Sequence, residues 1–262
     1  MLKALRDAFR PMEVECPNCR REDFVVAFTG SRFVLASQRI IGRPPLSLLN
    51  LRCGNCGATF QKVERGPRRI VGYHGCSHEF AEGIVSGRIP PTRWDYSENE
   101  YDWLGRGVYF WEDAPGRAWQ WAEQRHRQNS AVVAVELTLG TCVDLGDTEF
   151  VPLLRMSYED IIETYQSSEP PIPLPENEPL PRGNRPVDED LKLRKLDRLV
   201  VDHLVKLLQE RNVSVQTVRA PFEEGSSAFP GGKIRTQSHV QISVLDRSCI
   251  GRKIWRIPRG AS

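Results

Sequence analysis

The sequence predicts an α+β protein in two parts, a small β domain followed by a larger domain of mixed helices and strands. Two Cys-x-x-C pairs lie within the first 60 residues, and helical and strand-like patterns intermix after residue 69. Residues 1–66 hold eleven Lys and Arg against six Asp and Glu, a net charge of +5. The whole chain is +2, so the remainder is −3. This difference suggests two units with different partners.

The composition is that of an ordinary folded protein. Of its 262 residues, 40% are hydrophobic and 27% charged, which argues against a disordered, fibrous or membrane-embedded chain. No apolar run approaches the ~18–20 residues of a membrane span, and the first residues do not resemble a secretory signal. We therefore expect a cytoplasmic protein with no membrane partner. In that compartment cysteines are metal ligands or buried thiols more often than disulfides.

Four of the seven cysteines have metal-ligand spacing. Cys16 and Cys19 form one Cys-x-x-C pair, and Cys53 and Cys56 form the other. Two residues between thiolates let a tight turn direct both sulfurs at one ion, and four thiolates fill the tetrahedral shell of Zn²⁺. Strand-like runs at 24–28, 32–36 and 58–63 complete a β zinc ribbon, in which structural zinc replaces a core too small to be stable alone. A redox centre, which normally needs one pair, and coincidence are the alternatives.

The same segment is basic and contains aromatic residues. Its arginines would meet phosphates and its phenylalanines would stack on bases if the ribbon contacts nucleic acid. A solvated basic face over core aromatics explains the pattern equally well. The residues concerned are Arg20, Arg21, Arg32, Arg39, Arg43, Arg52, Phe24, Phe28 and Phe33.

The larger domain begins after a short linker at residues 65–69. We expect a buried strand over 70–75, then a helix capped by Ser77 and running to Gly87. A polar loop follows over 89–102 and a second strand over 107–111. Asp113 is then expected to cap a helix with Pro115 in its first turn.

The second half of this domain contains the strongest strand pattern, over residues 131–139. Seven prolines within 167–186 predict an irregular, exposed insertion. A helix is expected over 188–211, with His203 on its face, and strands near 214–219, 239–245 and 253–257 close the domain. The sequence thus predicts domains at 1–66 and 67–262.

Three motifs of the second part resemble a known enzyme family. They are residues 73–77 (YHGCS), 102–112 (DWLGRGVYFWE) with the following 118–122 (AWQWA), and 238–244 (SHVQISV). Over about residues 69–257 the chain resembles ADP-ribosyltransferases of the PARP-like, diphtheria-toxin-type branch. The resemblance implies a split-β-sheet fold, NAD⁺ as substrate, and cleavage of its glycosidic bond through an oxocarbenium-like transition state. Rossmann, P-loop, GxSxG and HExxH motifs are absent.

By that resemblance each motif supplies a site residue. His74 would hydrogen-bond the nicotinamide-side ribose, the backbone of Gly75 would hold the carboxamide, and Tyr109 would stack on the nicotinamide ring. The third position, where many members have Glu, is Gln241, which can bond the ribose but cannot carry charge or act as a base. Single transfer is therefore expected rather than polymer synthesis. Glu224, in the loop before that strand, is the candidate for the missing carboxylate.

Each of these residues also has a simpler interpretation. His74 would be a structural strand-end histidine, Tyr109 a core aromatic, and Glu224 a solvated loop acid. Glu112 and Asp246 are weaker candidates for the carboxylate. The residues expected in the core or cleft walls are Trp103, Trp111, Trp119, Trp121, Cys76, Cys142 and Cys249.

The function expected is mono-ADP-ribosylation of a macromolecule, nucleic acid or protein, to which the basic ribbon would deliver the enzyme. A role as a bacterial toxin or phage-defence effector is suggested by the family resemblance alone. One alternative is an adaptor whose ribbon binds nucleic acid or protein and whose second domain binds NAD⁺ or ADP-ribose without catalysis. Another is an NAD⁺ glycohydrolase, with water as the acceptor.

Overall fold

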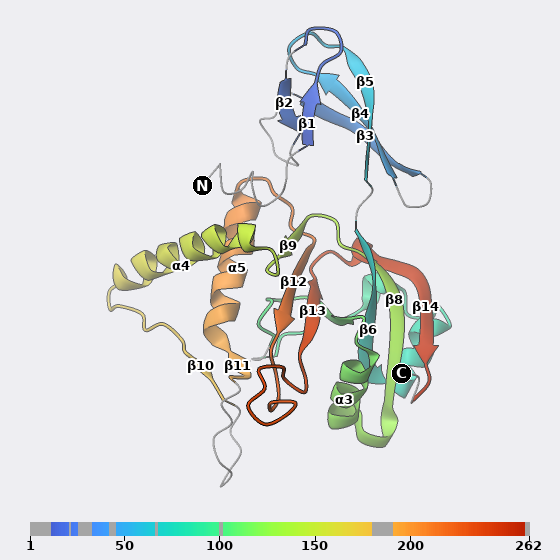
Figure 1. Cartoon of the computed structure of the whole chain (residues 1–262), viewed down its shortest axis with the longest axis vertical. Helices are drawn as coiled ribbons and strands as arrows, with labels where there is room; N and C mark the ends of the chain where they lie inside the picture. The colour runs from blue at the N-terminus through green and yellow to red at the C-terminus, as the bar shows by residue number, and fades with distance from the viewer. Residues whose placement is uncertain are drawn as a thin grey trace.

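The computed structural model describes residues 12–20, 22–25, 33–41, 46–65, 68–99, 102–179 and 191–259. It confirms the α+β class: a small all-β part contains strands β1 to β5, and a larger part combines helices with a seven-stranded mixed sheet (Figure 1). None of the helices in these ranges is long and apolar enough to span a membrane.

The N-terminal part, here called the ribbon, consists of two small antiparallel sheets. One pairs β1 (Met12–Glu15) with β2 (Glu22–Val25), and the other contains β3 (Phe33–Ile41), β4 (Leu46–Cys53) and β5 (Thr59–Arg65) in that order. The run expected at 58–63 is β5, and those at 24–28 and 32–36 overlap β2 and β3 but extend outside the described residues. Strand β4 was not predicted. It ends on Cys53, so its apolar run leads directly into the second cysteine pair.

The larger part, here called the body, is built on a sheet with the strand order β14-β8-β6-β7-β13-β12-β9. Neighbouring strands are antiparallel, except that β12 and β9 are parallel. The strands are β6 (Arg69–Ser77), β7 (Val108–Glu112), β8 (Ser130–Thr138), β9 (Cys142–Asp144), β12 (Thr217–Phe222), β13 (His239–Val244) and β14 (Ile250–Ile257).

The sheet opens between β6 and β7. These strands pair at only two positions, Gly72 with Glu112 and Tyr73 with Trp111. By contrast, β6 pairs with β8 along its whole length, from Arg69 to Ser77. From His74 onward β6 therefore follows β8 and leaves β7.

Helices cover both faces of the sheet. On one face α2 (His78–Val85) packs its Ala81 and Ile84 into a cluster with β7, β8 and β13. On the other, α3 (Pro115–His126) packs on β6 and β8, while α4 (Val151–Gln166) packs on α5 (Lys195–Glu210) over β12. The strands between α3 and α5 on that face are β7 and β13, which become the floor of the site.

Several helix boundaries differ from the prediction. Ser77 caps α2 as expected, accepting a hydrogen bond from the N–H of Phe80 at 3.2 Å. Asp113 does not cap α3: the cap position is Ala114, and Asp113 lies one residue too early, at φ +48°. Helix α5 begins at Lys195, later than the expected 188, because β11 (Leu193–Arg194) precedes it.

Other segments also depart from the prediction. Helix α4 was missed. The expected polar loop contains a 3₁₀ turn, Pro91–Arg93, and the buried Trp94. The proline-rich segment is irregular and largely exposed up to β10 (Asn177–Glu178), which pairs with β11, and residues 180–186 lie outside the described part.

Candidate active site and metal centre

The four cysteines of the two Cys-x-x-C pairs meet at one point. Sγ of Cys16 lies 3.6 Å from Sγ of Cys56, and Sγ of Cys19 lies 3.8 Å from Sγ of Cys53. All four sulfurs lie within 4.8 Å of one another. Sulfurs held ~2.3 Å from a tetrahedral Zn²⁺ ion are about 3.8 Å apart. The thiols are therefore close enough to hold a metal ion, and their spacing fits tetrahedral coordination.

Both cysteine pairs adopt the same turn. The N–H of Arg20 donates to the carbonyl oxygen of Cys16 at 2.9 Å, and that of Gly57 donates to Cys53 at 2.9 Å. Arg20 and Gly57 both have left-handed backbone conformations, with φ of +56° and +75°. Glycine adopts this conformation without steric cost, whereas arginine rarely does. The repeated turn points both sulfurs of a pair to one side, and four thiolates leave no open coordination position.

Some of the expected nucleic-acid residues can be placed. Arg20 pairs with Glu15 at 2.9 Å, and Arg52 is exposed. The rest of the set lies outside the residues, or the side chains, that the structure describes: Arg21, Arg32, Arg39, Arg43, Phe24, Phe28 and Phe33.

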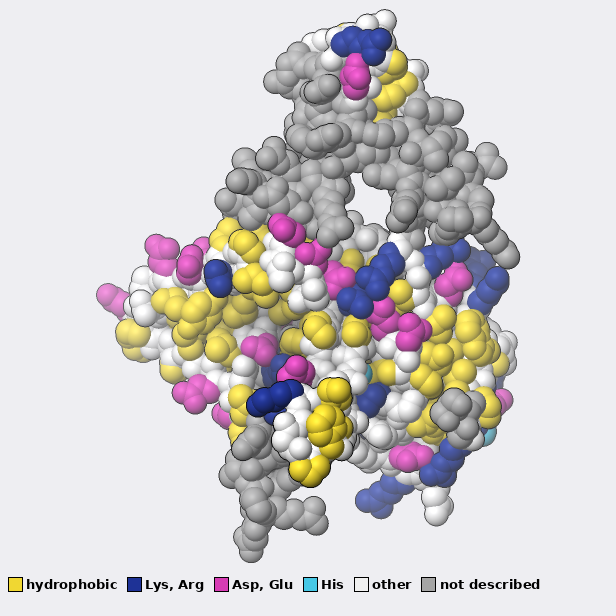
Figure 2. Space-filling view, viewed as in Figure 1, with side chains coloured by type: hydrophobic (Ala, Val, Ile, Leu, Met, Phe, Trp, Pro, Cys, Tyr) yellow, Lys and Arg dark blue, Asp and Glu magenta, His cyan; other side chains and the backbone are white. Residues whose placement is uncertain are grey.

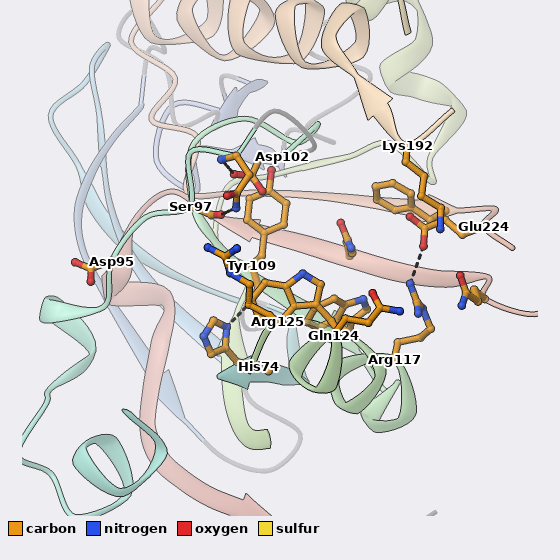
Figure 3. A pocket seen from close by; sticks show the side chains of 17 residues that line it. His74, Asp95, Ser97, Asp102, Tyr109, Arg117, Gln124, Arg125, Lys192 and Glu224 are labelled. Carbon is orange, nitrogen blue, oxygen red and sulfur yellow. Dashed lines mark hydrogen bonds and ion pairs between the residues drawn. The ribbon is translucent and has the colours of Figure 1, made fainter. Parts of the chain in front are cut away.

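A cavity of about 320 Å³ lies over β7 and β13, beside α3 (Figure 3). Although they come from β6, β7, β13 and the loop after β12, all five residues assigned from the resemblance line this cavity. They are His74, Gly75, Tyr109, Gln241 and Glu224. The fold thus brings together side chains that are far apart in the sequence.

His74 stands where β6 leaves β7, and it packs on the rings of Trp94 and Phe110, with centroids 5.3 and 5.5 Å away. Its Nδ1 lies 2.9 Å from the carbonyl oxygen of Tyr109. Because a carbonyl only accepts, Nδ1 carries the proton. Burial lowers the pKa of His74, so the ring is neutral near pH 7 and Nε2 is an acceptor. This nitrogen suits a hydroxyl donor.

Tyr109 is fixed by its hydroxyl group. The hydroxyl donates to the carbonyl oxygen of Gly105 at 2.7 Å and accepts from the N–H of Leu104 at 3.1 Å. Burial raises the pKa of Tyr109 well above its ordinary value, so the group stays protonated. With the hydroxyl bound to the backbone, the half-buried ring is the part of Tyr109 that a ligand can contact.

Gly75 allows helix α3 to approach the sheet. A Cβ at this position would lie 2.6 Å from the carbonyl oxygen of Ala118 and 3.1 Å from Cε3 of Trp121. Here the space is filled by α3, and the close packing places Trp121 in the cavity wall.

Gln241 and Trp111 lie directly opposite each other on β13 and β7. Opposed residues of an antiparallel pair point to the same face, as do Tyr109 and Trp111 two positions apart. These three side chains therefore share the cavity floor. The amide of Gln241 has no hydrogen-bond partner among the described residues, so both its donor and its acceptor are available to a ligand.

Glu224 is engaged in an ion pair. Its Oε2 accepts from Nη2 of Arg117 at 2.6 Å, and both side chains are 15% exposed. Glu224 is therefore neither the solvated loop acid of the simpler interpretation nor a free carboxylate. Figure 3 shows this pair at the end of the cavity away from His74 and Tyr109. It ties the loop after β12 to α3.

The two weaker carboxylate candidates are bound elsewhere. Glu112 accepts from Nε of Arg219 at 2.5 Å and from Nη2 of Arg68 at 3.0 Å. Asp246 accepts from Nε2 of Gln216 at 3.0 Å and from the N–H of Ser248 at 2.9 Å. Neither is among the described residues that line the cavity.

Helix α3 contributes three site residues that the sequence did not single out. Arg117, Gln124 and Arg125 line the cavity together with Trp121, which was expected in the core or a cleft wall. They occupy positions i, i+4, i+7 and i+8, which form one face of a helix. The sequence does contain a signal for this face of α3. A large tryptophan lies at helical spacing among charged and polar residues, which is more typical of a cavity wall than of a helix face exposed only to solvent.

The remaining singled-out residues are structural. His203 of α5 bonds Oδ2 of Asp160 on α4 at 2.6 Å, away from the cavity. Cys76 and Cys249 are buried, and burial raises the pKa of each thiol to about 12. Cys142, which is only partly buried by surface area, has its pKa raised to about 12 for the same reason.

The tryptophans occupy the core and the walls as expected. Trp103 and Trp111 are buried, and Trp119 and Trp121 of α3 pack against the cluster that contains Trp111.

A scan of the chain against known family models finds no match, and neither does a search of the curated proteins. The motifs and the geometry of the cavity are therefore the observations that bear on function.

Proposed function

We propose that this protein is a mono-ADP-ribosyltransferase that takes NAD⁺ and modifies a macromolecule. The observation that supports this most is the shared cavity of His74, Tyr109 and Gln241 at the opening between β6 and β7. Three residues chosen from separate motifs had no reason to meet if the motifs were coincidental.

The chemistry assigned to these residues is consistent with their surroundings. Nε2 of His74 would accept a hydrogen bond from the nicotinamide-side ribose, and the anchored ring of Tyr109 would stack on nicotinamide. The bond between ribose C1′ and the nicotinamide nitrogen breaks, and its electron pair neutralises the departing ring. The acceptor then bonds to C1′ and loses its proton to water or a base.

Glu224 does not suit the role of that base in this arrangement. Its Oε2 is held by Arg117, and the pair lies at the end of the cavity away from His74 and Tyr109 (Figure 3). Gln241 cannot take a proton either. The proposed reaction therefore relies on positioning of the two reactants. It also needs an acceptor that is already nucleophilic or that loses its proton readily to water. The same cavity geometry is compatible with transfer of ADP-ribose to water and with binding of NAD⁺ without catalysis. Both functions stay alternatives, and the experiment below separates them.

The ion held by the four thiols is proposed to be structural Zn²⁺. Four sulfur ligands at tetrahedral spacing favour Zn²⁺ among common cellular divalent ions. We propose that the ribbon recruits the nucleic acid or protein that carries the acceptor.

The test uses purified protein, adenine-labelled NAD⁺ and separate pools of protein, DNA and RNA. Alongside His74→Ala, we would use His74→Asn, whose side-chain N–H can replace Nδ1 as donor to Tyr109 while Nε2 is lost. Both variants should reduce label transfer by about 100-fold or more. The matched control is His203→Ala, which removes a histidine outside the cavity and should transfer label like the parent.

The outcomes separate the candidate functions. Label in one pool, lost in His74→Asn and kept in His203→Ala, supports a transferase and identifies its acceptor class. Free ADP-ribose with released nicotinamide would instead indicate a glycohydrolase. Intact NAD⁺ that binds the protein without turnover would indicate the adaptor, and NAD⁺ that neither binds nor reacts would refute the assignment of the cavity.

A further inference from the structure

One arginine in the cavity wall has no partner among the residues that the structure describes. Arg125, in the last turn of α3, lines the cavity, is exposed, and makes no ion pair or hydrogen bond with these residues. Arg117, two turns earlier on the same face of α3, differs because Glu224 neutralises it at 2.6 Å. Arg125 is therefore a positive charge of the cavity that its surroundings leave uncompensated.

The other charges of the cavity indicate where an anion would lie. Figure 3 shows the carboxyl groups of Asp95 and Asp102 at the end that holds Tyr109, and the neutral ion pair of Arg117 at the opposite end. Arg125 lies between them, because eight residues of α-helix carry the chain about 12 Å from Arg117. An anion would be repelled from the acidic end and attracted to the middle of the cavity, beside α3.

The proposed dinucleotide would bring such an anion to this place. The negative charges of NAD⁺ are on its pyrophosphate, which is joined to the nicotinamide-side ribose. With nicotinamide on the ring of Tyr109 and this ribose at His74, the pyrophosphate would follow one sugar further along the cavity. A guanidinium offers a planar fork of donors that matches two phosphate oxygens, and such charge-assisted hydrogen bonds are stronger than neutral ones.

We infer that Arg125 is a binding residue whose guanidinium holds the pyrophosphate of the bound dinucleotide. The inference rests on the proposed function and adds a contact that the three motif positions do not include. A cation in the last turn of a helix also stabilises the helix end, so the experiment has to separate binding from this structural role.

The test compares Arg125→Gln with Arg127→Gln. Both arginines are exposed at the C-terminal end of α3, so each substitution removes one positive charge there, but Arg127 does not line the cavity. Arg125→Gln should bind NAD⁺ and ADP-ribose about tenfold more weakly than the parent and bind nicotinamide, which has no phosphate, unchanged. Arg127→Gln should bind all three like the parent. Thermal unfolding of both variants checks that the fold is retained.

A second measurement tests the charge itself. Added salt should weaken ADP-ribose binding by the parent and by Arg127→Gln, and should weaken that by Arg125→Gln much less, because the screened attraction has been removed. An unchanged affinity of Arg125→Gln for ADP-ribose would overturn the inference and leave the proposed function standing. An equal loss of nicotinamide binding would also overturn it, since the cavity would then be distorted. Failure of the parent to bind NAD⁺ or ADP-ribose at all would overturn both.

Discussion

The ribbon and the body achieve their stability by different means. Among the ribbon side chains that the structure describes, the buried cluster consists of Cys16, Leu51 and Cys53, and two of these belong to the cluster of four thiols. In the body, two clusters contain 14 and 15 buried residues, and α4 and α5 cover one of them. Figure 2 shows hydrophobic side chains over the helical side of the body. With Zn²⁺ in the four-cysteine cluster as proposed, the cohesion of the ribbon depends on an ion, whereas that of the body depends on burial.

The largest expected effect is on the ribbon alone. Cys16→Ser removes one of four ligands and should release the ion and unfold the ribbon, because a structural Zn²⁺ contributes roughly 10–16 kcal/mol, more than a small domain's whole stability. The melting temperature of the body should not change. Metal content by mass spectrometry and hydrogen exchange of the two regions would test this.

Cys249→Ser is the matched control for that experiment. Cys249 is buried in the body and is not one of the four clustered thiols, so its substitution should leave the metal content intact. Two results would contradict this comparison: a Cys16→Ser variant that keeps the ion, or a variant in which loss of the ion unfolds the body together with the ribbon.

The ribbon and the body also differ in how much of their structure could be predicted from the sequence, because the ribbon is set by local motifs and the body by long-range contacts. The cluster of four thiols could be predicted almost completely, because two Cys-x-x-C pairs contain nearly all of its geometry. The strands of the large sheet other than β9, and the positions of His74, Tyr109 and Gln241, followed from local patterns and motif resemblance. The Arg117–Glu224 pair could not be predicted, since it joins a helix and a loop 107 residues apart. Helix α4 was missed because its apolar residues pack on α5, a contact that local periodicity does not reveal.

The next effect concerns the point where the chain enters the body. Arg68, just before β6, and Arg219 on β12 alternate with Glu112 and Asp144 in a ring of four charges, with contacts of 2.5 to 3.4 Å. Glu112 is 9% exposed and Arg219 15%. Arg219→Met would leave Glu112 nearly buried with only Arg68 to pair it, and should destabilise the body by about 3 kcal/mol.

A surface pair serves as the control for the charge ring. Arg69 and Glu136 lie 3.2 Å apart with side chains 40% and 42% exposed, so Arg69→Met should cost less than about 1 kcal/mol. Urea unfolding of both variants gives the comparison. Equal losses would show that the ring contributes no more than an ordinary surface pair.

The smallest of these effects arises inside the body and depends on pH. His239 stacks on Phe222, with centroids 5.1 Å apart, and its Nδ1 lies 2.6 Å from the carbonyl oxygen of Gln237 and 3.3 Å from Nε of Arg117. One nitrogen cannot donate to the carbonyl and accept from Arg117 together, and the shorter contact identifies it as the donor. Burial lowers the pKa of His239 to about 4, so the folded protein holds this ring neutral.

Unfolding restores the ordinary pKa of His239. Between about pH 6.5 and 4 the unfolded chain therefore binds a proton at this residue, whereas the folded protein does not. The stability from neutral His239 is therefore complete above about pH 6.5 and is lost as the pH falls towards 4, by about 2 kcal/mol at pH 5. His239→Leu should remove this part of the slope in urea unfolding between pH 7 and 5. An equally steep slope in the variant would mean that other groups cause the acid sensitivity. Loss of the ribbon in Cys16→Ser should leave the slope unchanged, because the titrating ring lies wholly within the body.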